Sequence, residues 1–120
     1  MAKKELLSFI IFGLILLSNS AHADDSYIFI SLGMPKESLN SLFEEAKELE
    51  VTFVLRGLKD NSFKQTTEYL QSLNVEANPS IIIDPNLFKE HDITAVPTFV
   101  SGENKLTGNV TIKFAQEKLK

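Results

Sequence analysis

The residues I-T-A-V-P-T-F-V at positions 93–100 decide the fold, because they place a proline at the entrance of a short apolar segment. Proline cannot donate a hydrogen bond to a β-ladder, but a strand tolerates it at its first residue. Pro97 therefore predicts a tight turn followed by a strand over residues 98–101. The next residues, Gly102–Asn104, predict a hairpin turn that leads into a brief strand at 105–106.

A final helix is expected beyond this hairpin, with Thr111 or Asn109 as its N-cap. Its apolar positions are Ile112, Ala115 and Leu119.

The segment before Pro97 predicts a strand and a short helix. Asp84 and Pro85 form an N-cap and first-turn pair, which favours a helix through Phe88. Before this pair, Ser80–Ile83 contains three consecutive isoleucines, which fit a central buried strand better than a half-exposed one.

The first half of the chain predicts a β-α-β unit with parallel strands. Tyr27–Leu32 is apolar on both faces up to Ser31, and Val51–Leu55 is a second apolar run of strand length. Between them, Pro35 is expected in the first turn of a helix. The apolar stripe of this helix is Leu39, Leu42, Phe43, Ala46 and Leu49, and its expected solvated face carries Glu44, Glu45, Lys47 and Glu48.

Another helix is expected after the second strand. Ser62 with Gln65 resembles a capping box, and Asp60 is the alternative cap. This helix is expected to end near Asn74, and its apolar positions are Phe63, Thr66, Leu70 and Leu73. The whole chain then predicts an α/β fold with a mixed sheet and the order β-α-β-α-β-α-β-β-α.

Residues 1–23 have the pattern of a cleaved export signal. Two lysines precede an apolar run over residues 6–17, and the triplet Ala-His-Ala at 21–23 fits a signal peptidase site. The run is shorter than the roughly 20 residues that a membrane-spanning helix needs. We therefore expect residues 24–120 to form one exported domain without stable membrane insertion.

The charge balance argues against direct nucleic-acid binding. The chain has 12 lysine and arginine residues against 16 aspartate and glutamate residues, a net charge of −4. Removal of residues 1–23 makes the remainder more acidic, because two lysines and one glutamate are lost. Without a basic cluster, such a chain cannot neutralise several phosphates at once.

The 120 residues contain no cysteine, so disulfides, thiolate nucleophiles and cysteine metal sites are excluded. His91 is the one histidine after residue 23, and a surface or capping role is expected for it. We expect no catalytic residue, no metal and no cofactor.

The order of elements, with a β-α-β half followed by a proline-led hairpin and a terminal helix, is similar to the three-layer thioredoxin-like fold. Six collinear segments narrow the resemblance to the TrbC family, the pilin assembly proteins of F-type conjugative transfer systems. These segments are FISLGMP (29–35), VLRGL (54–58), SFK (62–64), IDPNLF (83–88), TAVPTFV (94–100) and GNV (108–110).

This resemblance implies a non-enzymatic periplasmic component of a type IV secretion apparatus. It would act in conjugative pilus assembly through contacts with other transfer proteins, with pilin as a further candidate partner. A periplasmic peptide-binding chaperone or adaptor unrelated to conjugation is the alternative. The resemblance also implies a cis peptide between Val96 and Pro97, beside the turn Ser31–Pro35, where thioredoxin-like proteins carry two cysteines. Disulfide exchange is excluded here, because serine has no thiol.

Three uses of the domain stay open. In the first, a groove beside Val96 and Pro97, lined by Met34 and Phe99, holds an extended partner segment that pairs with the Val96 backbone as an added strand. The alternative to this first use is that Met34 and Pro97 have only structural roles, in packing and in turning the chain. In the second, the domain is a cysteine-free enzyme that uses the Ser31 hydroxyl, although no base lies nearby in sequence.

In the third, the domain bridges larger proteins through a surface remote from the turn Ser31–Pro35, and Arg56, just past a strand end, is the candidate residue of that surface. The guanidinium of this arginine would hold either a carboxylate of a partner or an internal one such as that of Asp60.

Overall fold

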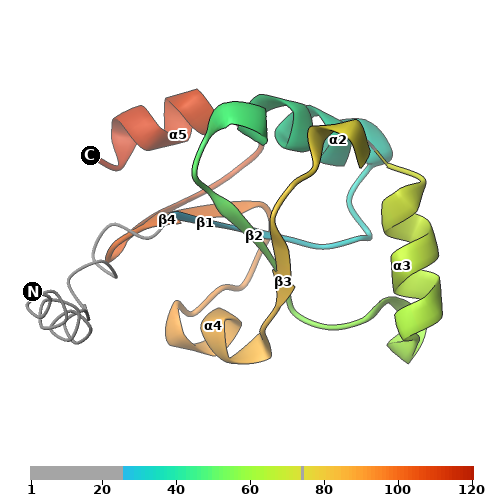
Figure 1. Ribbon diagram of the computed structural model, residues 1–120. Helices are drawn as coiled ribbons and strands as arrows, with labels where there is room; N and C mark the ends of the chain where they lie inside the picture. Colours follow the sequence, from blue (N-terminus) through green and yellow to red (C-terminus); the bar gives the residue numbers. More distant parts are fainter. Residues whose placement is uncertain (1–25, 74) are drawn as a thin grey trace, which may run out of the picture.

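The computed structural model describes residues 26–73 and 75–120 (Figure 1). Their strands and α-helices follow the predicted order, with short 3-10 helices (η) between them. The elements are β1 (Ser26–Ile30), α2 (Lys36–Glu45), η2 (Ala46–Glu48), β2 (Thr52–Leu55), η3 (Lys59–Asn61), α3 (Phe63–Gln71), η4 (Val75–Ala77), β3 (Ile81–Ile83), α4 (Pro85–Glu90), β4 (Thr98–Ser101), β5 (Asn104–Thr107) and α5 (Ile112–Lys118). The predicted signal peptide, residues 1–23, and the predicted helix end at Asn74 lie outside the described residues.

The strands form one five-stranded sheet in the order β3-β2-β1-β4-β5. β1 pairs parallel with β2 and antiparallel with β4, β2 pairs parallel with β3, and β4 with β5 forms the antiparallel hairpin. The prediction of a mixed sheet is therefore confirmed. β1 is the middle strand, which agrees with the apolar residues on both of its faces.

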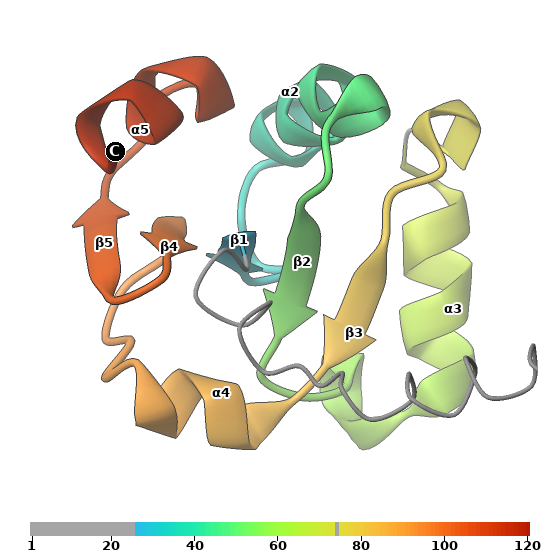
Figure 2. The ribbon, with the colours of Figure 1, turned by 60° about the vertical axis from the view of Figure 1, so that its left-hand side comes forward.

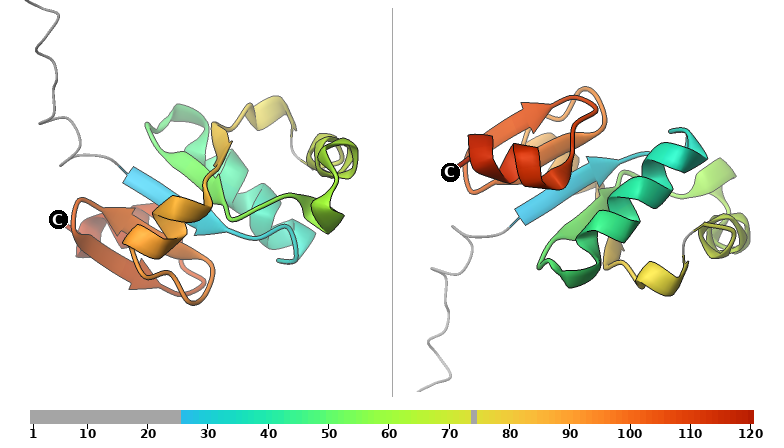
Figure 3. Two further views of the ribbon diagram at one scale, coloured as in Figure 1. Left: turned by 90° about the horizontal axis from the view of Figure 1, so that it is seen from below. Right: turned by 90° about the horizontal axis from the view of Figure 1, so that it is seen from above.

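Helices cover both faces of the sheet, which gives the three layers (Figures 2 and 3). α2 and α5 lie on one face and α4 lies on the other, while α3 stands beside β3. Neighbouring residues of β1 point to opposite faces, so Ile28 and Ile30 pack under α2 and α5, and Phe29 packs against Phe88 of α4. The rings of Phe29 and Phe88 are 4.9 Å apart, edge to face.

The prediction that the three isoleucines form a central buried strand is wrong. β3 is the edge strand, and Ile82 and Ile83 are 37% and 41% exposed. Among the strands that the structure describes, only β2 pairs with β3. The apolar run therefore marks an edge strand that is partly exposed, and not the centre of the sheet.

Several helix ends follow the predictions closely. The Ser62 hydroxyl accepts from the Gln65 amide, the Asp84 carboxylate accepts from the Asn86 and Leu87 amides, and the Thr111 hydroxyl accepts from the Phe114 amide. These bonds identify Ser62 and Thr111 as the caps, in preference to Asp60 and Asn109.

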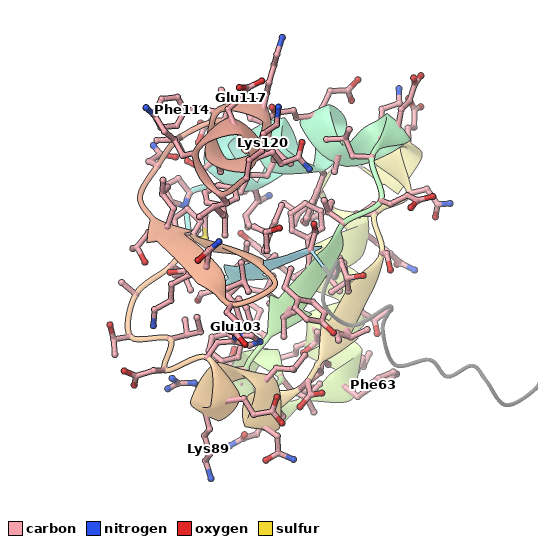
Figure 4. The ribbon with its side chains drawn as sticks, turned by 90° about the vertical axis from the view of Figure 1, so that its left-hand side faces the viewer. Phe63, Lys89, Glu103, Phe114, Glu117 and Lys120 are labelled. Atoms are coloured by element: carbon pink, nitrogen blue, oxygen red, sulfur yellow. The ribbon has the colours of Figure 1, made fainter. Side chains whose placement is uncertain are left out.

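Three details of the predicted helices are wrong. Pro35 is the N-cap residue of α2, with an extended ψ of 141°, and does not lie in the first helical turn. Leu49 is 38% exposed, because the helix gives way to η2 and the chain then turns towards β2. Phe63, the first residue of α3, is 72% exposed and lies far from Phe114 of α5, which is 45% exposed (Figure 4).

The prediction that Glu45 lies on a simple solvated face of its helix is wrong. Its two carboxylate oxygens accept from the Ile112 amide at 2.8 Å and the Lys113 amide at 2.9 Å. The last residue of α2 thus caps the first turn of α5, where unpaired amides favour a negative charge. This contact fixes the two helices of one layer to each other.

Candidate functional site

A groove of about 460 Å³ opens at the carboxyl ends of the parallel strands β1 and β2. This is the end towards which the arrows of β2 and β3 point in Figure 2, close to α4. Three segments that are distant in sequence form its walls: residues 30–33 from the end of β1, residues 55–59 from the end of β2, and Phe88 of α4 with residues 93–96 of the loop before β4. In parallel α/β sheets, ligands bind at this end of the strands.

The groove brings together three of the six candidate residues. Ser31, Arg56 and Val96 line it, one from each wall. The prediction that Met34 and Phe99 line it is wrong. Phe99 is only 3% exposed, because it points into the core under α2 and α5, and Met34 packs against the same core from outside. Pro97 is buried as well.

The Val96 backbone is unpaired at the rim of the groove. The peptide bond between Val96 and Pro97 is cis, as the resemblance implied. The carbonyls on both sides of Val96 are already bonded: that of Ala95 accepts from the Thr98 hydroxyl at 2.7 Å, and that of Pro97 accepts from the Gly108 amide at 3.0 Å. Within residues 26–73 and 75–120, neither the amide nor the carbonyl of Val96 has a hydrogen-bond partner.

Ser31 is occupied by the turn in which it lies. Its hydroxyl accepts from the Gly33 amide at 3.0 Å, and its carbonyl accepts from the Met34 amide at 3.1 Å. In the part of the chain that the structure describes, no hydrogen bond joins this hydroxyl to a histidine, aspartate or glutamate. The serine therefore shapes the turn and has no adjacent base to activate it.

Arg56 contacts Phe88 of α4 and the loop after this helix, and not Asp60, so the internal alternative of an Asp60 partner is not found. The guanidinium carbon lies 5.0 Å from the centre of the Phe88 ring, and Nη2 donates to the Ile93 carbonyl at 3.5 Å. Asp60 has a positive φ of 52° within η3, and no ion pair joins it to Arg56 among the described residues. The arginine stays exposed to solvent.

Two lysines near the groove were not singled out from the sequence. Lys59, which lines the groove, places its ammonium 4.8 Å from the centre of the Tyr69 ring, and the ammonium of Lys36 lies 5.6 Å from the same ring. Lys59 is fixed further by its amide, which donates to the buried hydroxyl of Thr66 at 2.7 Å. The sequence signal for Lys59 was its position after a strand end, where loops often carry function.

His91 lies away from the groove, at the end of α4. It is the C-cap residue of that helix, and its carbonyl accepts from the Lys105 ammonium at 2.7 Å. Its ring lies 5.7 Å from that of Phe29. The predicted capping role fits this position.

Neither a metal cluster nor a membrane helix is found in the described part of the chain. Residues 26–73 and 75–120 hold no group of three or more histidine, aspartate or glutamate residues arranged to bind a metal ion. None of the helices in these two ranges has the length and apolar character required to span a bilayer.

Comparison with solved structures supports the class of fold. The chain is similar to a structure titled "Crystal Structure of StoA from Bacillus subtilis", with a TM-score of 0.51 and 17% identity over 81% of this chain and 82% of the other. The fold is thioredoxin-like.

The chain belongs to the TrbC family. Residues 28–119 match the family described as "Type-F conjugative transfer system pilin assembly protein". The chain is also 32% identical over 96 residues to "Periplasmic protein TrbC" of Escherichia coli (strain K12). The match covers 76% of this chain but 45% of the relative, so the chain spans about half of the relative's length. The relative is periplasmic, which confirms the localisation predicted from the sequence.

Proposed function

We propose that residues 24–120 form a non-enzymatic assembly domain of a type-F conjugative transfer system, and that this domain holds an extended segment of another transfer protein in the groove. The family gives the process, which is pilin assembly in conjugative transfer. The mode of action is our inference from the groove.

The unpaired backbone of Val96 carries this proposal. A free amide and a free carbonyl at the rim of a groove can pair with an extended chain, as in other cases of strand addition. The antiparallel ladder between β1 and β4 ends at the pair Phe29 and Thr98, so a guest strand would not displace an existing one. Val96 is half-buried, and its side chain packs against Phe29 and its neighbours, which holds the backbone in place.

The same region supports a role without catalysis. The turn that holds paired cysteines in thiol-active relatives of this fold has Ser31 here, and the chain contains no cysteine. A serine hydroxyl needs a base to become a nucleophile, and the hydrogen bonds of Ser31 stay within its own turn. Binding of other proteins is the use of the groove that these residues favour.

Gly57 offers a direct test, because it lines the groove and an added Cβ would meet no atom within 4 Å. The variant Gly57→Phe should therefore fold normally but fill part of the groove. We expect cells that carry only this variant to lose extended pili, while the melting temperature of the purified protein stays unchanged. Gly57→Ala is the matched control, since it adds only a methyl group and should assemble pili normally.

Photo-crosslinking in living cells gives the second readout. A crosslinking amino acid at position 31 should capture another transfer protein, whereas the same group at exposed position 117 on α5 should not (Figure 4). Normal pili with a folded Gly57→Phe variant would place the contact surface elsewhere. Turnover of a disulfide substrate by the purified protein would overturn the non-enzymatic role.

A further inference from the structure

The groove is positively charged although the chain is acidic. Arg56 and Lys59 are the two charged residues that line it, and no aspartate or glutamate lies among its lining residues in the described ranges. The chain as a whole has a net charge of −4. Two cations at one groove of an acidic protein favour an anionic occupant, because complementary charges guide partners to such surfaces.

The cations around this groove rest on aromatic rings and not on carboxylates. Arg56 lies over Phe88, and Lys59 and Lys36 share the ring of Tyr69. The ion pairs found among residues 26–73 and 75–120 join other lysines, Lys47 to Glu44 and Lys64 to Glu68. Within these ranges, none of the three cations takes part in an ion pair.

Contact with a ring orients a cation and leaves its hydrogen-bond donors available. A guanidinium has five N–H donors in a planar fork, and Arg56 uses one of them on the Ile93 carbonyl at a distance of 3.5 Å. The remaining donors match the two oxygens of a carboxylate. An arginine arranged in this way is ready to bind a carboxylate side chain.

We propose that the segment held in the groove carries aspartate or glutamate side chains, and that Arg56 and Lys59 bind them, with Lys36 adding to the positive charge. This inference rests on the proposed function and specifies the chemistry of the partner. In an extended segment paired with Val96, alternate side chains point to one side. Acidic residues at such positions would reach the cations while the backbone of the segment pairs with Val96.

The test uses the protein purified from the periplasm and short overlapping peptides that tile the other proteins of the same transfer system. Both peptide ends are capped, so that only side chains supply carboxylates. We expect the peptides that bind to contain aspartate or glutamate, and replacement of these residues by asparagine or glutamine to weaken binding about tenfold. Arg56→Gln and Lys59→Gln should each cause a loss of similar size for the acidic peptides.

Lys118→Gln is the matched control. The ammonium of Lys118 also lies over an aromatic ring, 5.4 Å from the centre of Phe114, but on α5 and away from the groove. This variant should bind the peptides normally. The variant Arg56→Glu should reverse the preference and bind a peptide in which lysine replaces the acidic residue better than the unmodified protein does.

The possible results separate this inference from the proposed function. If peptides bind and block crosslinking at position 31 but show no dependence on carboxylates or on Arg56, the acidic segment is ruled out while the groove remains the binding surface. If no peptide blocks this crosslinking and Gly57→Phe has normal pili, both proposals fail.

Discussion

Arg56 has its contacts far along the chain, which explains why the sequence suggested Asp60 as an internal alternative but not the partners that the structure shows. Asp60 is only four residues away, but the chain turns at η3 and the guanidinium reaches Phe88 and the Ile93 carbonyl instead. Local hydrogen bonds were easier to predict. The Ser62 and Asp84 caps bond to amides two or three residues further on, so their partners follow from spacing alone.

Arg56→Lys separates an internal role of this residue from a role in binding. Lysine keeps the charge but loses the planar fork. Because the side chain is exposed, we expect the free energy of unfolding to fall by less than about 1 kcal/mol. Partner capture by crosslinking at position 31 should fall clearly. A large drop in melting temperature with unchanged capture would show that Arg56 mainly stabilises the fold.

At the scale of elements, sequence patterns identified the strands but not the place of each strand in the sheet. Three consecutive isoleucines fit an edge strand as well as a central one, because the order β3-β2-β1-β4-β5 is fixed by tertiary packing. The contact between Glu45 and α5 could not be predicted from the sequence either, since the bonded residues are 67 and 68 positions apart.

The edge position of β3 predicts unequal effects of the same substitution. Ile28→Ala in the central strand removes a side chain that is 2% exposed and should destabilise the protein by about 2 to 5 kcal/mol. Ile82→Ala at the edge, where 37% is exposed, should have an effect of about 1 kcal/mol or less. Urea denaturation of the two variants checks this difference, and equal losses would contradict the sheet order.

The carboxylate of Glu45 should stabilise the packing of α5. Glu45→Ala leaves the Ile112 and Lys113 amides without their acceptor, so we expect a loss of about 1 to 2 kcal/mol in the free energy of unfolding. Glu48→Ala, at an exposed position in η2, is the matched control and should stay within about 0.5 kcal/mol of the unmodified protein. Similar losses for both variants would argue against the cap.

At the scale of the whole molecule, the thioredoxin-like fold was predictable because element order, the proline-led strand and the family motifs agree. The candidate site was predictable only in part. Ser31, Arg56 and Val96 meet in the groove, whereas Phe99 is buried, because side chains alternate along β4 and this one points into the core. Which strand face is covered depends on the helices that pack there.

The domain boundaries lead to a prediction for the exported protein. We expect mass spectrometry of the periplasmic form to find Asp24 at its N-terminus. This form should unfold in a single cooperative transition, with circular dichroism and tyrosine fluorescence giving the same midpoint. An intact residue 1 in the periplasmic form, or two separate transitions, would contradict the predicted boundaries.

The walls of the groove come from residues 30–33, 55–59, 88 and 93–96, which are distant in sequence and meet only in the folded domain. An incompletely folded copy therefore has no such surface to offer. Under the proposed mode of binding, pilus construction would contain a built-in proofreading step, since only a finished domain could recruit the next component.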